Sequence, residues 1–134
     1  MMIKNIYFMF FVALFMFTMA ACTSQPKEKF KNLSADEFER MITEDTTVQC
    51  LDARTAEEYN EGHIKGCVNI DVKKDTFAEY AEAMLDKKHA IAVYCRSGKR
   101  SRKAAHILVK KGYRVYNLDK GIENWKELGK EIEL

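Results

Sequence analysis

The stretch Val93-Tyr94-Cys95-Arg96-Ser97-Gly98-Lys99-Arg100-Ser101-Arg102 decides the fold that we predict for this chain. The apolar run from Ala90 to Tyr94 is typical of a strand buried on both faces. After the loop, residues 104–109 carry apolar side chains at helical spacing. Cys95 is therefore expected where a strand ends and a loop leads into a helix. That is the edge of a parallel sheet at which open α/β proteins bind ligands.

The loop after Cys95 has the composition of an anion-binding turn. Backbone N–H groups in a tight turn that runs into a helix N-terminus favour negative charge, and Gly98 permits a left-handed conformation. Five cations and no acid follow the cysteine: Arg96, Lys99, Arg100, Arg102 and Lys103. Such surroundings lower a thiol pKa below its usual value of about 8.5. We predict a reactive and accessible thiolate at Cys95; the alternative is a small buried hydrophobe, as most free cysteines are.

The segment from Cys95 to Ser101 resembles the active-site loop of single-domain members of the rhodanese family, in which a cysteine opens a short turn and carries a persulfide. The resemblance implies that Cys95 is catalytic. It also implies that the next five residues bind substrate: Arg96, Ser97, Gly98, Lys99 and Arg100. Tyrosine phosphatases need one residue more between cysteine and arginine than the four that separate Cys95 from Arg100, and Arg102 comes one residue too late.

A second stretch resembles the same family. Asp52-Ala53-Arg54 is followed by Glu57, by Gly62-His63-Ile64-Lys65-Gly66 and by Asn69-Ile70, in the order that the family shows. By that resemblance Asp52 and Arg54 support the wall beside the catalytic loop. The other interpretation is a structural ion pair that braces the loop ends. For His63, we expect a turn residue hydrogen-bonded to the backbone rather than a general base.

The end of the chain carries a third family resemblance. Asp119 to Trp125 is similar to the closing signature of a glycine-rich turn and a helix with a tryptophan, although Lys120 stands where a first glycine is common. Earlier, residues 75–85 place Phe77, Tyr80, Ala81 and Met84 at helical offsets that should cover one face of the sheet. The resemblance and the alternation of strands and helices predict an α/β, rhodanese-like fold, with a central parallel sheet and helices on both faces.

The first residues are those of a secretory signal, which takes no part in the fold. Lys4 precedes an apolar run from Ile6 to Thr18, and Met19-Ala20-Ala21-Cys22 resembles a bacterial lipobox. That resemblance implies lipidation of Cys22 and a place in the cell envelope, on the extracytoplasmic side of a bacterial membrane. An uncleaved transmembrane anchor is the alternative, but residues 6–22 only reach the lower end of the usual length. The chain would then divide into a signal peptide (1–21), a tether (22–29) and a rhodanese-like domain (30–134).

The remaining cysteines leave at least one free thiol. If Cys22 carries lipid, Cys50, Cys67 and Cys95 remain, an odd number. Cys50 is expected in a core strand, and Cys67 either packs in the core or acts as a resolving thiol. No zinc-like spacing occurs, so we expect no metal and no organic cofactor. The near balance of 22 basic and 20 acidic residues argues against a nucleic-acid partner.

These patterns predict a sulfurtransferase that moves a sulfane sulfur through a Cys95 persulfide. Its partners would be a small anionic donor, thiosulfate or a persulfide, and a thiol or cyanide acceptor. We expect a monomer that meets the membrane through its lipid. Two other classes stay open: a phosphatase-like or arsenate-reductase-like enzyme that acts on an oxyanion, and a non-catalytic redox or persulfide switch that joins Cys67 to Cys95.

Overall fold

The computed structural model describes residues 29–134. The predicted signal peptide, the lipidation site at Cys22 and the tether as far as residue 28 lie outside the described residues. Within the described range, five strands and five helices follow one another along the chain: β1 Lys31–Leu33, α2 Ala35–Glu44, β2 Gln49–Asp52, α3 Ala56–Glu61, β3 Val68–Asn69, α4 Phe77–Met84, β4 Ile91–Tyr94, α5 Lys99–Lys110, β5 Val115–Leu118 and α6 Gly121–Glu127.

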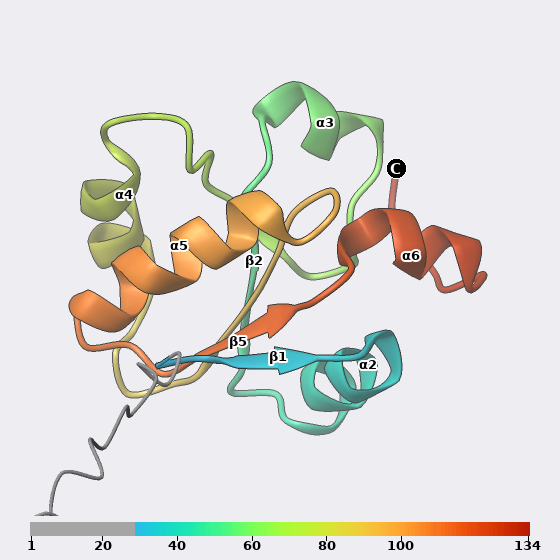
Figure 1. Ribbon diagram of the computed structural model, residues 1–134, viewed down its shortest axis with the longest axis horizontal. Coiled ribbons are helices and arrows are strands. Elements are labelled where there is room, and N and C mark those ends of the chain that lie inside the picture. The colour runs from blue at the N-terminus through green and yellow to red at the C-terminus, as the bar shows by residue number, and fades with distance from the viewer. Residues whose placement is uncertain (1–28) are drawn as a thin grey trace, which may run out of the picture.

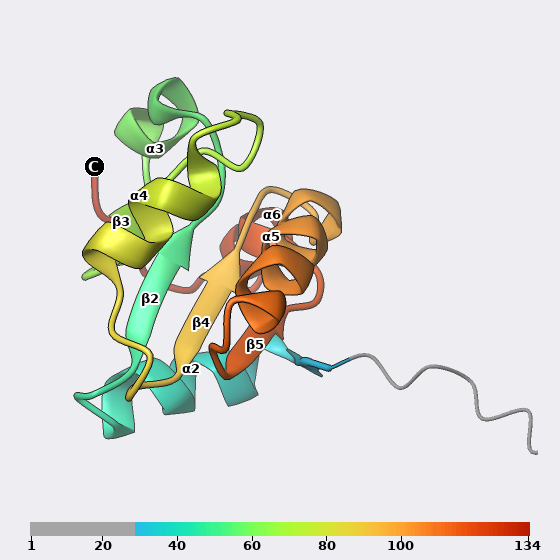
Figure 2. The same cartoon turned by 90° about the vertical axis from the view of Figure 1, so that its left-hand side faces the viewer.

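The strands form one sheet in the order β1-β5-β4-β2-β3, and every pairing is parallel. This confirms the predicted parallel sheet. Strand β1 forms the edge of the sheet beside β5 (Figure 1). The central strand is β4, which lies between β5 and β2 (Figure 2). All four of its residues are buried, as the apolar run predicted. The carboxyl end of β4 therefore emerges at the middle of the sheet edge, with Cys95 as the next residue.

Different helices cover the two faces of the sheet (Figure 2). Ile91 and Val93 of β4 pack with residues of α4 and α5 on one face. Ala92 and Tyr94 alternate to the other face, where they pack with residues of α2 and α6. Trp125 of α6 is 2% exposed and belongs to that second cluster. The predicted arrangement of helices on both faces is thus confirmed.

Helices α2 and α3 begin at residues whose side chains cap them. Ser34 caps α2 by accepting the Glu37 N–H at 3.2 Å. A full capping box opens α3: Thr55 accepts the Glu58 N–H, and the Glu58 carboxylate accepts the Thr55 N–H. Along the described residues, no helix is long and apolar enough to cross a membrane.

Helix α4 covers the sheet with only half of the side chains predicted for that role. Phe77 and Ala81 are buried against the sheet and α5. Tyr80 and Met84 are instead exposed by 57% and 52%, so their predicted place over the sheet is wrong. They line a hollow of about 280 Å³ whose wall also includes Asn69. The helix is only eight residues long, and one narrow stripe of it faces the core.

Candidate active site

Cys95 lies at the predicted junction of strand and helix. It directly follows the last residue of β4, and α5 begins at Lys99 with Gly98 as its N-cap. The Gly98 N–H donates a hydrogen bond to the Cys95 Sγ at 3.1 Å. Gly98 has a φ of 103°, which favours glycine, and a Cβ atom there would overlap the Asp119 carbonyl oxygen. The loop therefore turns tightly around the sulfur and points a backbone donor at it.

Helix α6 fixes the other side of the loop. The Ile122 N–H donates to the Cys95 carbonyl at 2.9 Å, and the Glu123 N–H donates to the Arg96 carbonyl at 3.1 Å. These two carbonyls are thereby held toward α6. Gly121 takes the positive φ of this turn, whereas Lys120 has a φ of −101° that any residue can adopt. A lysine in place of the family's first glycine therefore leaves the turn intact.

The sulfur is enclosed in this arrangement. Cys95 as a whole is 1% exposed, and its thiol is the only free one among residues 29–134. The expectation of an openly accessible thiol is therefore wrong for this structure. The physical reason is that the turn wraps over the side chain while α6 closes the opposite side.

Acidic side chains from other parts of the chain pair with all three arginines between Cys95 and Lys103. Arg96 pairs with Glu123 at 2.6 Å, and Arg102 lies 3.7 Å from Asp119. Arg100 makes two hydrogen bonds to Glu58, from Nη1 to Oε1 at 2.7 Å and from Nη2 to Oε2 at 2.8 Å. The local sequence shows the cations but not these acids, since Glu58 lies 42 residues away along the chain. The capping box that opens α3 was the available signal for Glu58, since it fixes where that side chain lies.

The two members of the Arg100–Glu58 pair shift each other's pKa. Hydrogen bonding and charge from Arg100 lower the pKa of Glu58 from 4.5 to about 2, against the effect of burial, and Thr55 contributes further. In the other direction, the hydrogen bonds and charge of Glu58 raise the pKa of Arg100, with smaller contributions from Cys95 and Asp71. Glu58 is therefore a carboxylate throughout the physiological pH range.

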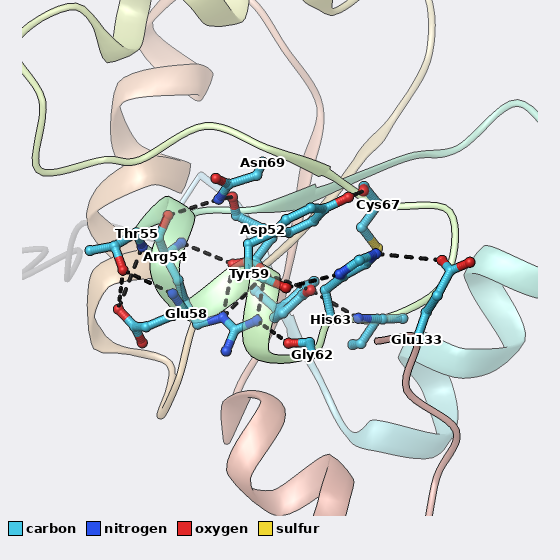
Figure 3. A network of polar contacts seen from close by, with 12 residues as sticks. Asp52, Arg54, Thr55, Glu58, Tyr59, Gly62, His63, Cys67, Asn69 and Glu133 are labelled. Atoms are coloured by element: carbon cyan, nitrogen blue, oxygen red, sulfur yellow. Dashed lines mark hydrogen bonds and ion pairs between the residues drawn. The ribbon is translucent and has the colours of Figure 1, made fainter.

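Asp52 and Arg54 form a buried ion pair, which agrees with the structural one of their two interpretations (Figure 3). The Arg54 Nη2 lies 2.7 Å from the Asp52 Oδ2 and also donates to the Gly62 carbonyl at 2.7 Å. The Tyr94 hydroxyl donates to the same Asp52 oxygen at 2.8 Å and accepts the Ile64 N–H at 3.0 Å. All three polar side chains are buried. The network thus ties the end of β4, one residue before Cys95, to β2 and to the turn after α3.

Burial and charge shift the pKa values of Arg54 and Tyr94. Burial opposes the charged form of Arg54, but the hydrogen bonds and charge of Asp52 outweigh it, so the pKa of Arg54 is raised. Burial, with the charge of Asp52 second, raises the pKa of Tyr94 far above its ordinary value. Tyr94 therefore remains a neutral phenol that donates to Asp52. Both Asp52 carboxylate oxygens are engaged within the network, which fits a supporting position.

His63 is held as a turn residue. Its Nδ1 lies 3.0 Å from the Tyr59 carbonyl oxygen, and its ring stacks on Tyr59 with centroids 3.7 Å apart. Its Nε2 lies 3.4 Å from a Glu133 carboxylate oxygen (Figure 3). The prediction of a backbone-bonded turn histidine is confirmed. The backbones of His63 and Glu133 also form a short antiparallel bridge, which joins the turn to the C-terminal segment.

Cys50 and Cys67 form a disulfide with their Cα atoms 4.4 Å apart. The parallel register explains why they meet: Leu51 lies opposite Val68, and the cysteines precede these two residues. Both are buried, as expected. Their expected place in the core is therefore confirmed. The alternative of a resolving role for Cys67 is wrong, because its sulfur is already bonded to Cys50. The pairing depends on strand register, which the sequence alone left open.

No group of three or more histidine, cysteine or acidic side chains suited to a metal ion occurs within residues 29–134. Of the predicted site residues, the structure brings Cys95 and Gly98 into contact and pairs Arg96 and Arg100 with acidic partners. Lys99 is exposed at the first position of α5, and Ser97 is exposed within the loop. The site therefore consists of one buried sulfur, a backbone N–H that donates to it, and arginines that form ion pairs with acidic side chains.

Comparison with known proteins agrees with this geometry. The rhodanese-like domain family matches residues 34–128. Thiosulfate sulfurtransferase GlpE of Shewanella oneidensis is 34% identical over 99 residues, which cover 73% of this chain and 94% of that protein. A crystal structure of a rhodanese-related protein from Thermoplasma volcanium is 25% identical, with a TM-score of 0.68, over 78% of this chain and 99% of the other.

Two longer relatives contain a similar segment. The putative sulfur carrier protein YrkF of Bacillus subtilis is 30% identical over 104 residues, which cover 77% of this chain and 55% of that protein. The tRNA uridine(34) hydroxylase of Staphylococcus saprophyticus is 37% identical over 116 residues, or 81% of this chain and 34% of the relative. The chain thus spans about half of the first protein and a third of the second, and nearly all of GlpE.

Proposed function

Because this chain belongs to the rhodanese-like domain family, we propose that it is a sulfurtransferase in which Cys95 carries the transferred sulfur as a persulfide. The observation that carries the proposal is the hydrogen bond from the Gly98 N–H to the Cys95 Sγ, within a loop that leads from β4 into α5. A backbone donor aimed at the sulfur stabilises negative charge there. The similarity to GlpE along almost all of its length supports the same activity.

In the proposed cycle, the Cys95 thiolate attacks the outer sulfur of the donor. With thiosulfate, the new S–S bond forms as the bond to the inner sulfur breaks, and sulfite leaves with that electron pair. Cys95 then holds a persulfide anion. A thiol acceptor attacks the outer sulfur of that anion, takes it as a persulfide and leaves the Cys95 thiolate; cyanide would leave as thiocyanate. The loop residues that would bind the donor are Arg96, Ser97, Gly98, Lys99 and Arg100.

The enclosed sulfur sets a condition on this cycle. Since Cys95 is 1% exposed, the loop or the side chains around it must part before a donor sulfur makes contact. Asp52 and Arg54 would act as supporting residues that hold the base of the loop through Tyr94. No metal or organic cofactor takes part in the proposed reaction.

The proposal includes a place outside the cytoplasm. The lipobox-like sequence at Cys22 and the Cys50–Cys67 disulfide support it, because disulfides persist in oxidising compartments such as the bacterial cell envelope. We infer a lipid-anchored monomer on the extracytoplasmic side of a bacterial membrane. Its partners would be a small anionic sulfur donor and a thiol or cyanide acceptor, with no nucleic acid.

Mass spectrometry of the intact protein after incubation with thiosulfate tests the proposal. We expect a gain of one sulfur atom on Cys95 and its loss on addition of cyanide, with thiocyanate formed. Cys95→Ser should abolish both while it changes the melting temperature little. A parallel incubation with an aryl phosphate separates the oxyanion-enzyme alternative: phosphate release without sulfur gain would overturn the proposal, as would turnover that survives in Cys95→Ser.

A further inference from the structure

The Glu58 carboxylate lies against the arginine that the loop would use to bind its donor. It accepts two hydrogen bonds from Arg100 and one from the Thr55 hydroxyl, at 3.1 Å. The Arg100 and Glu58 side chains are only 22% and 27% exposed. A bidentate pair of this kind is both stronger and better oriented than a single contact on the surface.

The paired acids change the charge that a donor would meet. With Arg96, Arg100 and Arg102 beside carboxylates, Lys99 and Lys103 are the loop cations that form no ion pair within residues 29–134. Both lysines are exposed on α5. An anion that approaches Cys95 therefore meets guanidinium groups whose charge is already balanced by carboxylates, that of Arg100 by Glu58.

We propose that Glu58 is a specificity-determining residue that weakens the use of dianionic donors such as thiosulfate and favours donors of one negative charge, such as small organic persulfides. This inference rests on the proposed sulfurtransferase function. Thiosulfate brings two negative charges to the Cys95 thiolate, where Glu58 already balances the charge of Arg100, whereas an organic persulfide anion brings one. Repulsion between like charges grows with the product of the charges, so the dianion is penalised more.

The chemical step is the same for both donors. The Cys95 thiolate attacks the outer sulfur of the organic persulfide, the new S–S bond forms, and the old one breaks with its electron pair on the departing thiolate. The enzyme persulfide is identical to the one formed from thiosulfate, and only the leaving group differs. The donor preference is therefore set by charge around the loop and not by a different mechanism.

Glu58→Gln is the variant that removes the charge and keeps the local structure. Glutamine at this helix position preserves a capping box with Thr55. The same substitution releases Arg100 to meet the donor. Glu57→Gln is the matched control, because Glu57 is the preceding residue of the same helix and is exposed. Both variants lose one negative charge, so a general change in surface charge affects them alike.

The experiment compares kcat/KM for thiosulfate with kcat/KM for the persulfide of 2-mercaptoethanol, with cyanide as acceptor in both cases. In Glu58→Gln we expect the ratio to shift toward thiosulfate by about tenfold, mainly through KM, and to shift less as salt is raised. Glu57→Gln should leave the ratio within about twofold, because its charge is solvated.

The outcomes separate this inference from the function on which it rests. A wild-type protein that gains sulfur from neither donor overturns the proposed function. A wild-type protein that gains sulfur, with a ratio that Glu58→Gln leaves unchanged or that Glu57→Gln shifts equally, overturns the role of Glu58 alone. Circular dichroism of each variant checks that the fold is kept.

Discussion

Gly121 lies so close to Arg96 that a Cβ atom on the glycine would overlap the arginine's carbonyl oxygen. The amides of the next two residues donate to the carbonyls of Cys95 and Arg96. The start of α6 thus holds the backbone of the catalytic loop in place. This close contact is possible only because residue 121 is a glycine.

Gly121→Ala and Gly98→Ala should both disrupt the loop. Each adds a Cβ atom against backbone, at positive φ, and we expect a loss of at least about 3 kcal/mol in the free energy of unfolding, together with loss of sulfur transfer. Gly66→Ala is the control, because its φ is also positive but no atom lies within 4 Å. It should cost only about 1–2 kcal/mol. Urea unfolding of the three variants measures these losses. Equal losses in all three would show that the close contacts of Gly98 and Gly121 do not matter for stability.

Tyr94→Phe should weaken the support below Cys95. The substitution leaves the buried Ile64 N–H without its acceptor and removes one donor from Asp52, so we expect a cost of about 1–3 kcal/mol. Tyr116→Phe is the matched control, since the Tyr116 hydroxyl makes no hydrogen bond among the described residues. Its expected change is within about 0.5 kcal/mol. Chemical denaturation decides, and a neutral Tyr94→Phe would show that the network adds nothing to stability.

Reduction should destabilise the domain without unfolding it at once. The Cys50–Cys67 bond closes a loop with a sequence separation of 17, for which chain entropy gives a contribution of about 3 kcal/mol. Unfolding measured with and without a phosphine reductant should differ by that amount in the wild-type protein. A Cys50→Ala/Cys67→Ala double variant should be insensitive to the reductant. Equal stability of oxidised and reduced wild-type protein would refute a structural role for the bond.

Acid should remove the contribution of the Glu58–Arg100 pair. The pKa of Glu58 is lowered in the folded state from 4.5 to about 2, so the unfolded chain binds the proton more readily. The stabilisation is complete above about pH 4.5 and is lost as the pH falls toward 2. The difference in unfolding free energy between wild type and Glu58→Gln should therefore shrink across this window. If this difference in unfolding free energy stayed constant between about pH 6 and about pH 2, the pair would not contribute to stability.

The sequence was sufficient for features that are local along the chain. The apolar run before Cys95, the glycine within the loop and the helical spacing after it predicted the strand, turn and helix, because each signal lies within a few residues of the feature it encodes. The ion pair of Asp52 and Arg54 was also within reach, since the two are separated by one residue.

Features that depend on how distant segments meet could not be predicted. Glu58 reaches Arg100 only because α3 is placed over the loop, and Cys50 meets Cys67 only through the register of β2 and β3. The enclosure of Cys95 was missed for the same reason, since α6 closes the loop from the far end of the chain. Composition alone therefore overstated both the free positive charge of the site and the openness of its sulfur.

With Cys50 and Cys67 bonded to each other, residues 29–134 hold no second thiol that could discharge a persulfide on Cys95. While the Cys50–Cys67 bond is intact, no thiol within residues 29–134 can attack the Cys95 persulfide to form an internal disulfide and release hydrogen sulfide. The lifetime of the proposed Cys95 persulfide would then depend on the concentration of acceptor thiols in solution. The domain would act as a reservoir, filled and emptied by its surroundings.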